Sequence, residues 1–274
     1  MPYDPASVAA YFDRFGHAEW DRFDRSLGDR VSFVLHAEAL ERAVPRGSRV
    51  LEVGAGPGRF TEVLHGLGCR VVVADLSATQ LALHREFAEA RGFAACVEAR
   101  HQLDICDLRA FEDASYDAVV AFGGPLSYVF EQRDHALAEC RRVVRPGGAI
   151  AVSVMSLWGT THRYLEAVLA GGPALAGEIV RTGDLTATTS PGSAHHCHMY
   201  RAAELRALLD AHDLVDVELS ASSALSTGVA SSVVAADSPP WLAVLELEGV
   251  ACAEPGYLDA GTHLLGLARR PAAG

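Results

Sequence analysis

The chain has 274 residues, of which 50% are hydrophobic and 21% are charged, and this balance excludes a disordered or low-complexity protein. A chain of this length is expected to form one main domain with additions, large enough to bury its own core. Asp and Glu number 35 against 23 Lys and Arg, which gives a formal net charge of −12. Nucleic-acid binding depends on cationic groups that replace condensed counterions, so we expect no nucleic-acid partner.

Targeting signals are not visible in the sequence. The first residues contain neither a basic n-region nor an apolar h-region, and no apolar run approaches the ~18 residues of a membrane span. The six cysteines are scattered and contain no CxxC pair. We therefore expect a cytoplasmic protein with reduced thiols and no membrane association.

Two helices are expected before residue 45. Asp4 followed by Pro5 is typical of a helix N-cap with proline in the first turn. Apolar residues at helical spacing follow, namely Val8, Tyr11, Phe12 and Phe15, and then Phe33, Ala37, Leu40 and Val44. Pro45-Arg46-Gly47 ends the second helix. Residues 1–44 are thus predicted to form an N-terminal helical cap.

Short apolar strands alternate with helices from residue 45 to residue 155. Strands are expected at 49–53, 71–74, 97–100, 117–122 and 149–155. Ser77 and Gln80 form an S-x-x-Q capping box at the start of one helix, and Pro146-Gly147-Gly148 ends the helix that contains Leu137. This alternation predicts an α/β fold with a doubly wound, mostly parallel sheet.

Residues 156–199 interrupt the alternation. They are rich in Gly, Thr, Ser and His, with weak helical periodicity around 164–169, and we predict a lid insertion over an acceptor site. The alternation resumes in residues 200–274, with a helix at 203–211, a strand at 214–219, a helix begun at Ser238 and a strand at 262–268. This remainder of the core brings the predicted sheet to seven strands.

Chemically distinctive segments follow several of the predicted strands. Gly54–Gly58, Asp75, Asp104 and Phe122–Leu126 would meet at one crevice, because parallel sheets bind ligands outside the carboxyl ends of their strands. Asp75 lies 75 − 54 = 21 residues after Gly54, where a carboxylate can accept hydrogen bonds from a ribose diol. Arg59 stands where the dinucleotide fingerprint has its third glycine.

These segments resemble the motifs of class I S-adenosylmethionine-dependent methyltransferases, with further likeness to a bacterial small-molecule type. The motifs are Val50-Leu51-Glu52-Val53-Gly54-Ala55-Gly56-Pro57-Gly58, Val73-Ala74-Asp75-Leu76-Ser77, Asp104-Ile105-Cys106-Asp107-Leu108, Tyr116-Asp117-Ala118-Val119-Val120 and Arg142-Val143-Val144-Arg145-Pro146-Gly147-Gly148. The resemblance implies a Rossmann-like methyltransferase fold, S-adenosylmethionine as cofactor, S-adenosylhomocysteine as product, and a role in secondary metabolism. Where nucleic-acid and protein amine methyltransferases often have Asn-Pro-Pro-Tyr, this chain has Phe122-Gly123-Gly124-Pro125. A small-molecule acceptor is therefore expected.

The resemblance also implies roles for individual residues. Gly54, Ala55, Gly56 and Gly58 would lie against the methionine part of the cofactor, and Glu52 would orient their loop. Asp75 would bind the ribose hydroxyls. Leu76, Asp104 and Ile105 would contact the adenine. Phe122 and Gly123 would flank the methionyl end.

Candidates for handling a proton of the acceptor are Tyr128, His196, His198 and Tyr200. The last three alternate at period two, so they would share one face of an extended segment, while His195 and Cys197 would point the other way. Adjacent residues cannot easily converge on one ion, so we expect no metal site. Arg141, Arg142 and Arg145 would meet the negative end of a helix dipole.

Other interpretations stay open from the sequence. An NAD(H)-dependent oxidoreductase would use the same glycine loop and Asp75. A cyclase or regulatory module could bind S-adenosylmethionine on this fold without methylating anything. The identity of the acceptor, the methylated atom and the formation of a homo-oligomer are not decided by the sequence.

Overall fold

The computed structural model describes residues 3–190, 193–229 and 234–273. Residues 1–2, 191–192, 230–233 and 274, which belong to the predicted cap, lid and final core segment, lie outside these ranges. The centre of the molecule is a seven-stranded sheet in the order β3-β2-β1-β4-β5-β9-β8. Its strands are β1 Arg49–Val53, β2 Arg70–Asp75, β3 Val97–Gln102, β4 Tyr116–Ala121, β5 Val144–Met155, β8 Val215–Ala221 and β9 His263–Arg269.

The first five strands are parallel, and β9 runs antiparallel to both β5 and β8. The register pairs Leu51 with Val72 on one side and with Val119 on the other. The strand order reverses between β1 and β4, which places the ligand-binding switch point at the carboxyl ends of these two strands. The predicted doubly wound, mostly parallel sheet is confirmed.

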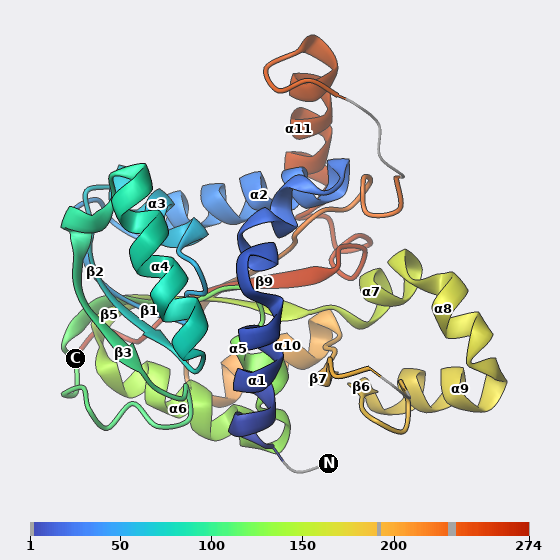
Figure 1. Cartoon of the computed structure of the whole chain (residues 1–274), viewed down its shortest axis with the longest axis horizontal. Helices are drawn as coiled ribbons and strands as arrows, with labels where there is room; N and C mark the ends of the chain where they lie inside the picture. Colours follow the sequence, from blue (N-terminus) through green and yellow to red (C-terminus); the bar gives the residue numbers. More distant parts are fainter. Residues whose placement is uncertain (1–2, 191–192, 230–233, 274) are drawn as a thin grey trace.

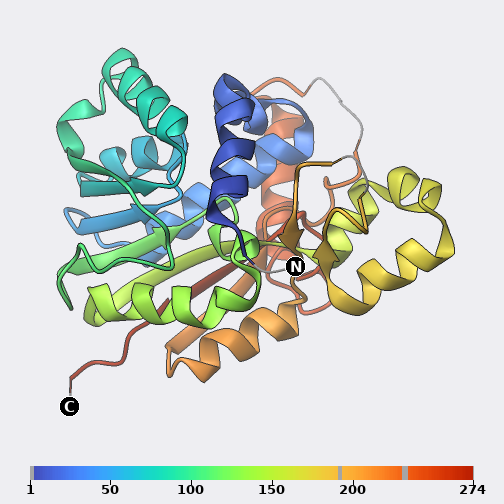
Figure 2. The same ribbon diagram turned by 60° about the horizontal axis from the view of Figure 1, so that its bottom comes forward.

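Helices cover both faces of the sheet (Figures 1 and 2). Leu40 of α2 and Leu64 of α3 are buried against one face, and Leu137 of α6 and Leu205 of α10 against the other. The helices of the core and cap are α1 Pro5–Phe15, η1 Gly16–Asp24, α2 Leu27–Ala43, α3 Arg59–Gly66, α4 Ala78–Arg91, η2 Ala94–Cys96, α5 Pro125–Tyr128, η3 Phe130–Gln132, α6 Arg133–Val143, α10 Ala202–Ala211 and α11 Pro239–Ala251.

Local signals fix several helix starts. The Asp4 side chain accepts a hydrogen bond from Ala6 N, as expected of an N-cap. Ser77 Oγ accepts from Gln80 N at 3.0 Å, but the reciprocal half of the predicted capping box is not formed. The Gln80 side chain instead donates to the carbonyl of Phe12, because α1 packs directly against α4.

Two sequence expectations need correction. The helix α6 ends at Val143 and β5 begins at once, so Pro146-Gly147-Gly148 is an irregularity within β5 rather than a turn before it; the strand partners jump from Tyr116–Val144 to Ala118–Ala149. Residues 156–199 contain more regular structure than their weak periodicity indicates. They form α7 Leu157–Arg163, α8 Leu165–Ala170 and α9 Gly172–Thr182, followed by a small hairpin of β6 Asp184–Leu185 and β7 Cys197–His198.

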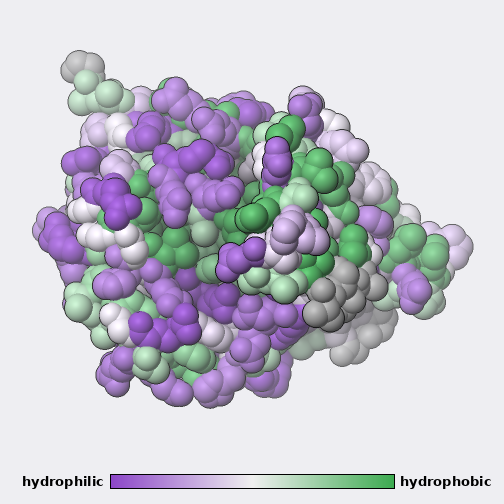
Figure 3. Space-filling model, turned by 90° about the horizontal axis from the view of Figure 1, so that it is seen from above, coloured by the Kyte–Doolittle hydropathy of each residue, from purple (hydrophilic) through white to green (hydrophobic). Residues whose placement is uncertain are grey.

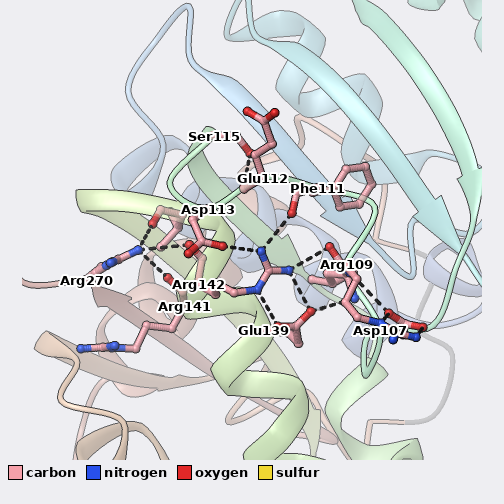
Figure 4. A network of polar contacts seen from close by, with 12 residues as sticks. Asp107, Arg109, Phe111, Glu112, Asp113, Ser115, Glu139, Arg141, Arg142 and Arg270 are labelled. Atoms are coloured by element: carbon pink, nitrogen blue, oxygen red, sulfur yellow. Dashed lines mark hydrogen bonds and ion pairs between the residues drawn. The ribbon is translucent and has the colours of Figure 1, made fainter.

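The basic cluster at the end of α6 has a fuller explanation than the helix dipole (Figure 4). The Arg142 guanidinium pairs with Glu139 and Asp113 and donates to the carbonyls of Leu108 and Phe111. Arg145 pairs with Asp117 at 2.8 Å. The Arg142 contacts fasten the 108–113 segment to α6.

The helix α11 projects from the end of the molecule that carries α2 (Figure 1). Trp241 is buried toward α2, whereas Leu242, Leu247 and Val250 are exposed, and Figure 3 shows hydrophobic side chains gathered on this face. Within the described part of the chain, each of the six cysteines is free, and every helix is too short or too polar to cross a membrane.

Candidate active site

The loop after β1 can form only because glycines stand at its turns. Gly54, Gly56 and Gly58 have φ angles of +67°, +54° and +100°, a region that residues with a Cβ rarely adopt. A Cβ added to Gly54 would lie 2.5 Å from Cγ of Pro125. Gly54 N also donates to the carbonyl of Ala74 at 2.8 Å, which ties the loop to the end of β2. The loop is therefore rigid and presents bare backbone.

This loop borders a cavity over the carboxyl ends of β1, β2 and β4. Among the predicted cofactor residues, those that line it are Gly54, Ala55, Gly56, Asp75, Leu76, Ile105, Phe122 and Gly123. The other predicted cofactor residues, Glu52, Gly58 and Asp104, do not line the cavity. The structure thus brings together the ends of separate strands, as the sequence predicts.

Asp75 is the buried anion of the cavity. One carboxylate oxygen accepts from Gly56 N and the other from Ser77 N, both at 2.8 Å. Burial raises the pKa of Asp75 to about 6, against the lowering effect of these backbone donors. Each oxygen keeps a further lone pair, so the carboxylate can hold the loop and still accept hydrogen bonds from a ligand.

Glu52 lies one layer deeper than the loop. Its carboxylate accepts from Thr61 Oγ1 at 2.6 Å, and Thr61 Oγ1 lies 2.9 Å from Nε2 of His84. Burial raises the pKa of Glu52 to about 8. This side chain braces α3 against β1, which supports the loop that joins them.

Asp104 contacts the N-terminal end of the chain. Its carboxylate accepts from the hydroxyl of Tyr3 at 2.9 Å and from Cys106 N at 2.8 Å. Tyr3, Leu103 and Ile105 line the cavity beside it. Tyr3 therefore closes this side of the cavity, a contact between residues 101 positions apart that the sequence does not reveal.

Two charged residues of η1, Glu19 and Arg22, form the opposite wall. They pair at 2.7 Å. A Cβ added to Gly123 would lie 2.8 Å from a guanidinium nitrogen of Arg22, and one added to Gly56 would lie 3.6 Å from Glu19. Desolvation by burial raises the pKa of Glu19. Sequence reasoning missed both as site residues, because an i, i+3 ion pair on a helix is ordinarily a surface feature.

Tyr128 stands at the boundary between this cavity and a second one. The second cavity is lined by Asp4, Ser7, Val8, Tyr11, Tyr128, Phe130, Ala194 and His196. The Tyr128 hydroxyl lies 2.9 Å from Nε2 of His195, and the Tyr11 ring stacks on the His195 ring with centroids 5.1 Å apart. Of the four proton-handling candidates, Tyr128 alone lines the main cavity, and His196 lines only the second one.

His198 and Tyr200 share a face, as expected, but this face is turned away from the cavity. The two nitrogens of His198 lie 2.7 Å from Asp184 and 2.8 Å from Glu204, and the buried Tyr200 hydroxyl donates to the carbonyl of Leu126. Cys197 and Met199 pack on the opposite side, in a cluster with Tyr128. The predicted orientation was wrong because period-two alternation separates two faces without indicating which one meets a cavity. The catalytic role proposed for these two residues finds no support in their position.

No group of His, Cys, Asp and Glu side chains within residues 3–190, 193–229 and 234–273 is arranged to hold a metal ion. The cavity offers a backbone loop, the buried Asp75 carboxylate, the half-buried Glu19–Arg22 ion pair and a tyrosine–histidine contact. Together these groups suit a ligand with a sugar diol and a charged end.

Comparisons with known proteins agree with this geometry. Residues 50–148 match the family model described as "Methyltransferase domain". The chain is 29% identical over 193 residues to methyltransferase GfsG of Streptomyces halstedii, covering 69% of this chain and 62% of that protein. It is 35% identical over 156 residues to the demethylmenaquinone methyltransferase of Clavibacter sepedonicus, covering 56% of this chain and 59% of that protein. The chain thus spans less than two thirds of the length of these relatives.

A solved structure supports the fold. It is the 1,6-didemethyltoxoflavin-N1-methyltransferase of Burkholderia thailandensis with bound 1,6-didemethyltoxoflavin and S-adenosylhomocysteine, with a TM-score of 0.55 and 19% identity over 97% of this chain and 88% of that one. The family match covers β1 through the first part of β5, where the glycine loop and Asp75 lie. Over residues 50–148 this chain is therefore similar to methyltransferase domains, and its fold is that of a solved methyltransferase.

Proposed function

We propose that the protein transfers a methyl group from S-adenosylmethionine to a small-molecule acceptor that is bound beneath α1 and the 156–199 insertion. The observation that carries this proposal is the cavity in which the glycine loop, Asp75 and the Glu19–Arg22 pair face one another. The names of the relatives support methyl transfer.

The residues present fit this cofactor. At Gly54 a Cβ would meet Pro125 and at Gly123 one would meet Arg22, so both positions need glycine and present backbone at the cavity wall. Asp75 would accept hydrogen bonds from the ribose hydroxyls. Leu76, Leu103 and Ile105 form an apolar side suited to the adenine, and Tyr3 closes it by bonding Asp104.

The Glu19–Arg22 pair would receive the amino-acid end of the cofactor. The Arg22 guanidinium can bind the carboxylate, and the Glu19 carboxylate can bind the ammonium group. Both partners are already present in the wall and neutralise each other at 2.7 Å. A zwitterionic ligand would thus replace an internal ion pair by two external ones without leaving a charge unpaired.

When bound, the cofactor supplies a methyl group on a sulfonium, which is already a strong electrophile. The protein then has to align the acceptor atom with that carbon and exclude water. Phe122 and Gly123 would flank the reacting end, and Val8, Phe12 and Tyr128 provide the adjoining cavity wall. A cytoplasmic location and a role in secondary metabolism stay predictions.

Cofactor binding is tested by isothermal titration calorimetry and thermal-shift measurements with S-adenosylmethionine, S-adenosylhomocysteine and NADH. We expect heat and a raised Tm with the two adenosyl compounds and neither with NADH. Stabilisation by NADH alone would favour the oxidoreductase. Mass spectrometry of reactions with candidate acceptors tests the transfer. A methylated product is heavier than the acceptor by ~14 Da, the mass of one CH₂, whereas the product of a cyclase would have the same mass as its substrate.

A further inference from the structure

The contact between Tyr128 and His195 is not needed to hold the cofactor. Tyr128 lies in the short helix α5, directly after the Phe122-Gly123 segment that follows β4. It is buried, it lines the main cavity, and its hydroxyl is 2.9 Å from Nε2 of His195. His195 comes from the 156–199 insertion, 67 positions later in the chain. The insertion thereby brings a titratable ring to the end of the cavity where the acceptor would lie.

We propose that Tyr128 and His195 form a proton relay for an acceptor whose methylated group is a phenolic hydroxyl. This inference rests on the proposed methyl transfer and names the chemical class of its acceptor. Tyr128 is the residue that touches the acceptor, and His195 acts through Tyr128.

Aromatic packing fixes the relay and explains the choice of a planar acceptor. Tyr11 stacks on His195 with an interplanar angle of 22°, and the edge of Phe12 meets Tyr128 with centroids 5.3 Å apart. Phe12 and Tyr128 both line the main cavity. Flat apolar walls of this kind suit an aromatic ring, and the Tyr128 hydroxyl supplies the polar atom that would orient its O–H group.

The protonation states are those that a relay needs. Burial lowers the pKa of His195 to about 4, so the ring is neutral at physiological pH and Nε2 can accept a hydrogen bond. Burial raises the pKa of Tyr128 well above its usual value, so its hydroxyl keeps its proton and donates it. The titratable and charged groups that face the pair are Tyr11 of α1, Glu19 and Arg22 of η1, His196 of the insertion, Cys197 of β7 and His263 of β9.

The step balances in protons and charge. The acceptor oxygen gives its proton to the Tyr128 oxygen as Tyr128 passes its own proton to Nε2 of His195. The acceptor oxygen bonds the methyl carbon, and the electron pair of the broken carbon–sulfur bond stays on sulfur. The positive charge thus moves from sulfur to the His195 ring, which contacts Tyr11 and Tyr128, two residues that line the second cavity, and we propose that its proton leaves by that cavity. A neutral amine attacks through its lone pair and needs no such acceptor of protons.

The protonation state is tested by ¹⁵N NMR of the histidine-labelled full chain at pH 7 with S-adenosylhomocysteine. His195→Gln assigns the signal, and His65→Gln, at an exposed position on α3, is the matched control. We expect Nε2 of His195 to be unprotonated and its shift to move in Tyr128→Phe. An imidazolium at pH 7, or a proton on Nε2, would overturn the relay.

The acceptor class is tested by calorimetry of the S-adenosylhomocysteine complex with 4-nitrophenol and with 4-nitroanisole, which lacks the hydroxyl proton. We expect the phenol to bind about tenfold more tightly, the effect of one well-made hydrogen bond, and this preference to be lost in Tyr128→Phe. Should that variant not fold, His195→Gln provides the same comparison. Equal affinities in the wild type, or no binding of the phenol, would refute the phenolic acceptor. An absence of heat with S-adenosylhomocysteine itself would instead contradict the proposed function, so the two failures are distinguishable.

Discussion

The two walls of the cofactor cavity are built from different parts of the polypeptide. On the strand-end wall, Gly54 and Gly56 expose their backbone, and the Asp75 carboxylate accepts a hydrogen bond from Gly56 N. On the opposite wall, η1 and α1 present side chains, chiefly Glu19, Arg22 and Phe12. Added atoms at Gly54 would meet Pro125, and both glycines have positive φ, whereas a side-chain wall can be changed residue by residue. With the proposed function, the ribose of the cofactor would depend on the first wall, whereas the second wall would meet both its amino-acid end and the acceptor.

Substitution of Gly54 should break the strand-end wall most severely. In Gly54→Ala the new methyl group meets Pro125 at 2.5 Å and the backbone is held at positive φ. We expect S-adenosylhomocysteine affinity, measured by calorimetry, to fall at least ~100-fold, since strain and clash each cost about 1–2 kcal/mol. The control Gly68→Ala also has positive φ but no atom within 4 Å of the added methyl group, and it should bind normally. Equal losses in both variants would remove the steric explanation.

Asp75 gives the second largest expected effect. Asp75→Asn should weaken S-adenosylhomocysteine binding by about 1–3 kcal/mol, because an amide group must turn a donor toward Gly56 N or Ser77 N. The pKa of about 6 means that the wild-type carboxylate becomes protonated as the pH falls through 6. Below pH 6, Asp75 must therefore lose a proton before a ligand that requires the ionised carboxylate can bind. The affinity for such a ligand should fall by up to ~10-fold per pH unit below 6.

Calorimetry at several pH values and in buffers of different ionisation enthalpy measures this linkage. Asp107→Asn, at an exposed ion pair with Arg109, is the matched control and should keep the wild-type profile. A wild-type affinity that stays constant from pH 7 to pH 5 would contradict the role of Asp75.

Substitution of Arg142 tests whether the stability of the fold can be lowered without changing cofactor affinity. Its guanidinium contacts Glu139, Asp113 and two main-chain carbonyls near the amino ends of β4 and β5, at the other end of the strands from the strand-end wall (Figure 4). Arg142→Ala should lower the free energy of unfolding, measured with urea, by about 2–3 kcal/mol, since hydrogen bonds of a charged group are lost and their acceptors stay half-buried. Arg109→Ala, which removes an exposed pair, should cost less than ~1 kcal/mol. Cofactor affinity should be unchanged in both, and a selective loss of affinity would refute this assignment.

Tyr200 gives the smallest expected effect and tests the catalytic role predicted for it from the sequence. Tyr200→Phe removes one hydrogen bond to the carbonyl of Leu126, at 3.2 Å, and should reduce the free energy of unfolding by about 1 kcal/mol without altering cofactor affinity or turnover. Tyr257→Phe, at an exposed position, is the control and should change neither quantity. Reduced turnover at full stability would restore the catalytic role predicted from the sequence.

The core segment 45–155 and the insertion 156–199 differ in how well their structure could be predicted from the sequence. In residues 45–155 each of the five strands carries a local signal, although the short helices η2, α5 and η3 do not. Apolar runs mark the strands, Ser77 caps α4, and glycines mark the positive-φ turns of the loop after β1. In residues 156–199 the helices are mostly exposed, with Leu165 and Leu169 at the surface, so burial leaves little periodicity to read.

The sequence by itself determined the order of strands and helices, the glycine loop and the placement of Asp75, because backbone conformation and side-chain periodicity are local properties. Only the tertiary structure decided that His195 rather than His198 meets Tyr128, that Glu19 and Arg22 face Gly56 and Gly123, and that Tyr3 closes on Asp104. Contacts of this kind join segments far apart in the chain. They depend on which face of each segment is turned inward, and alternation along a sequence is the same for either choice.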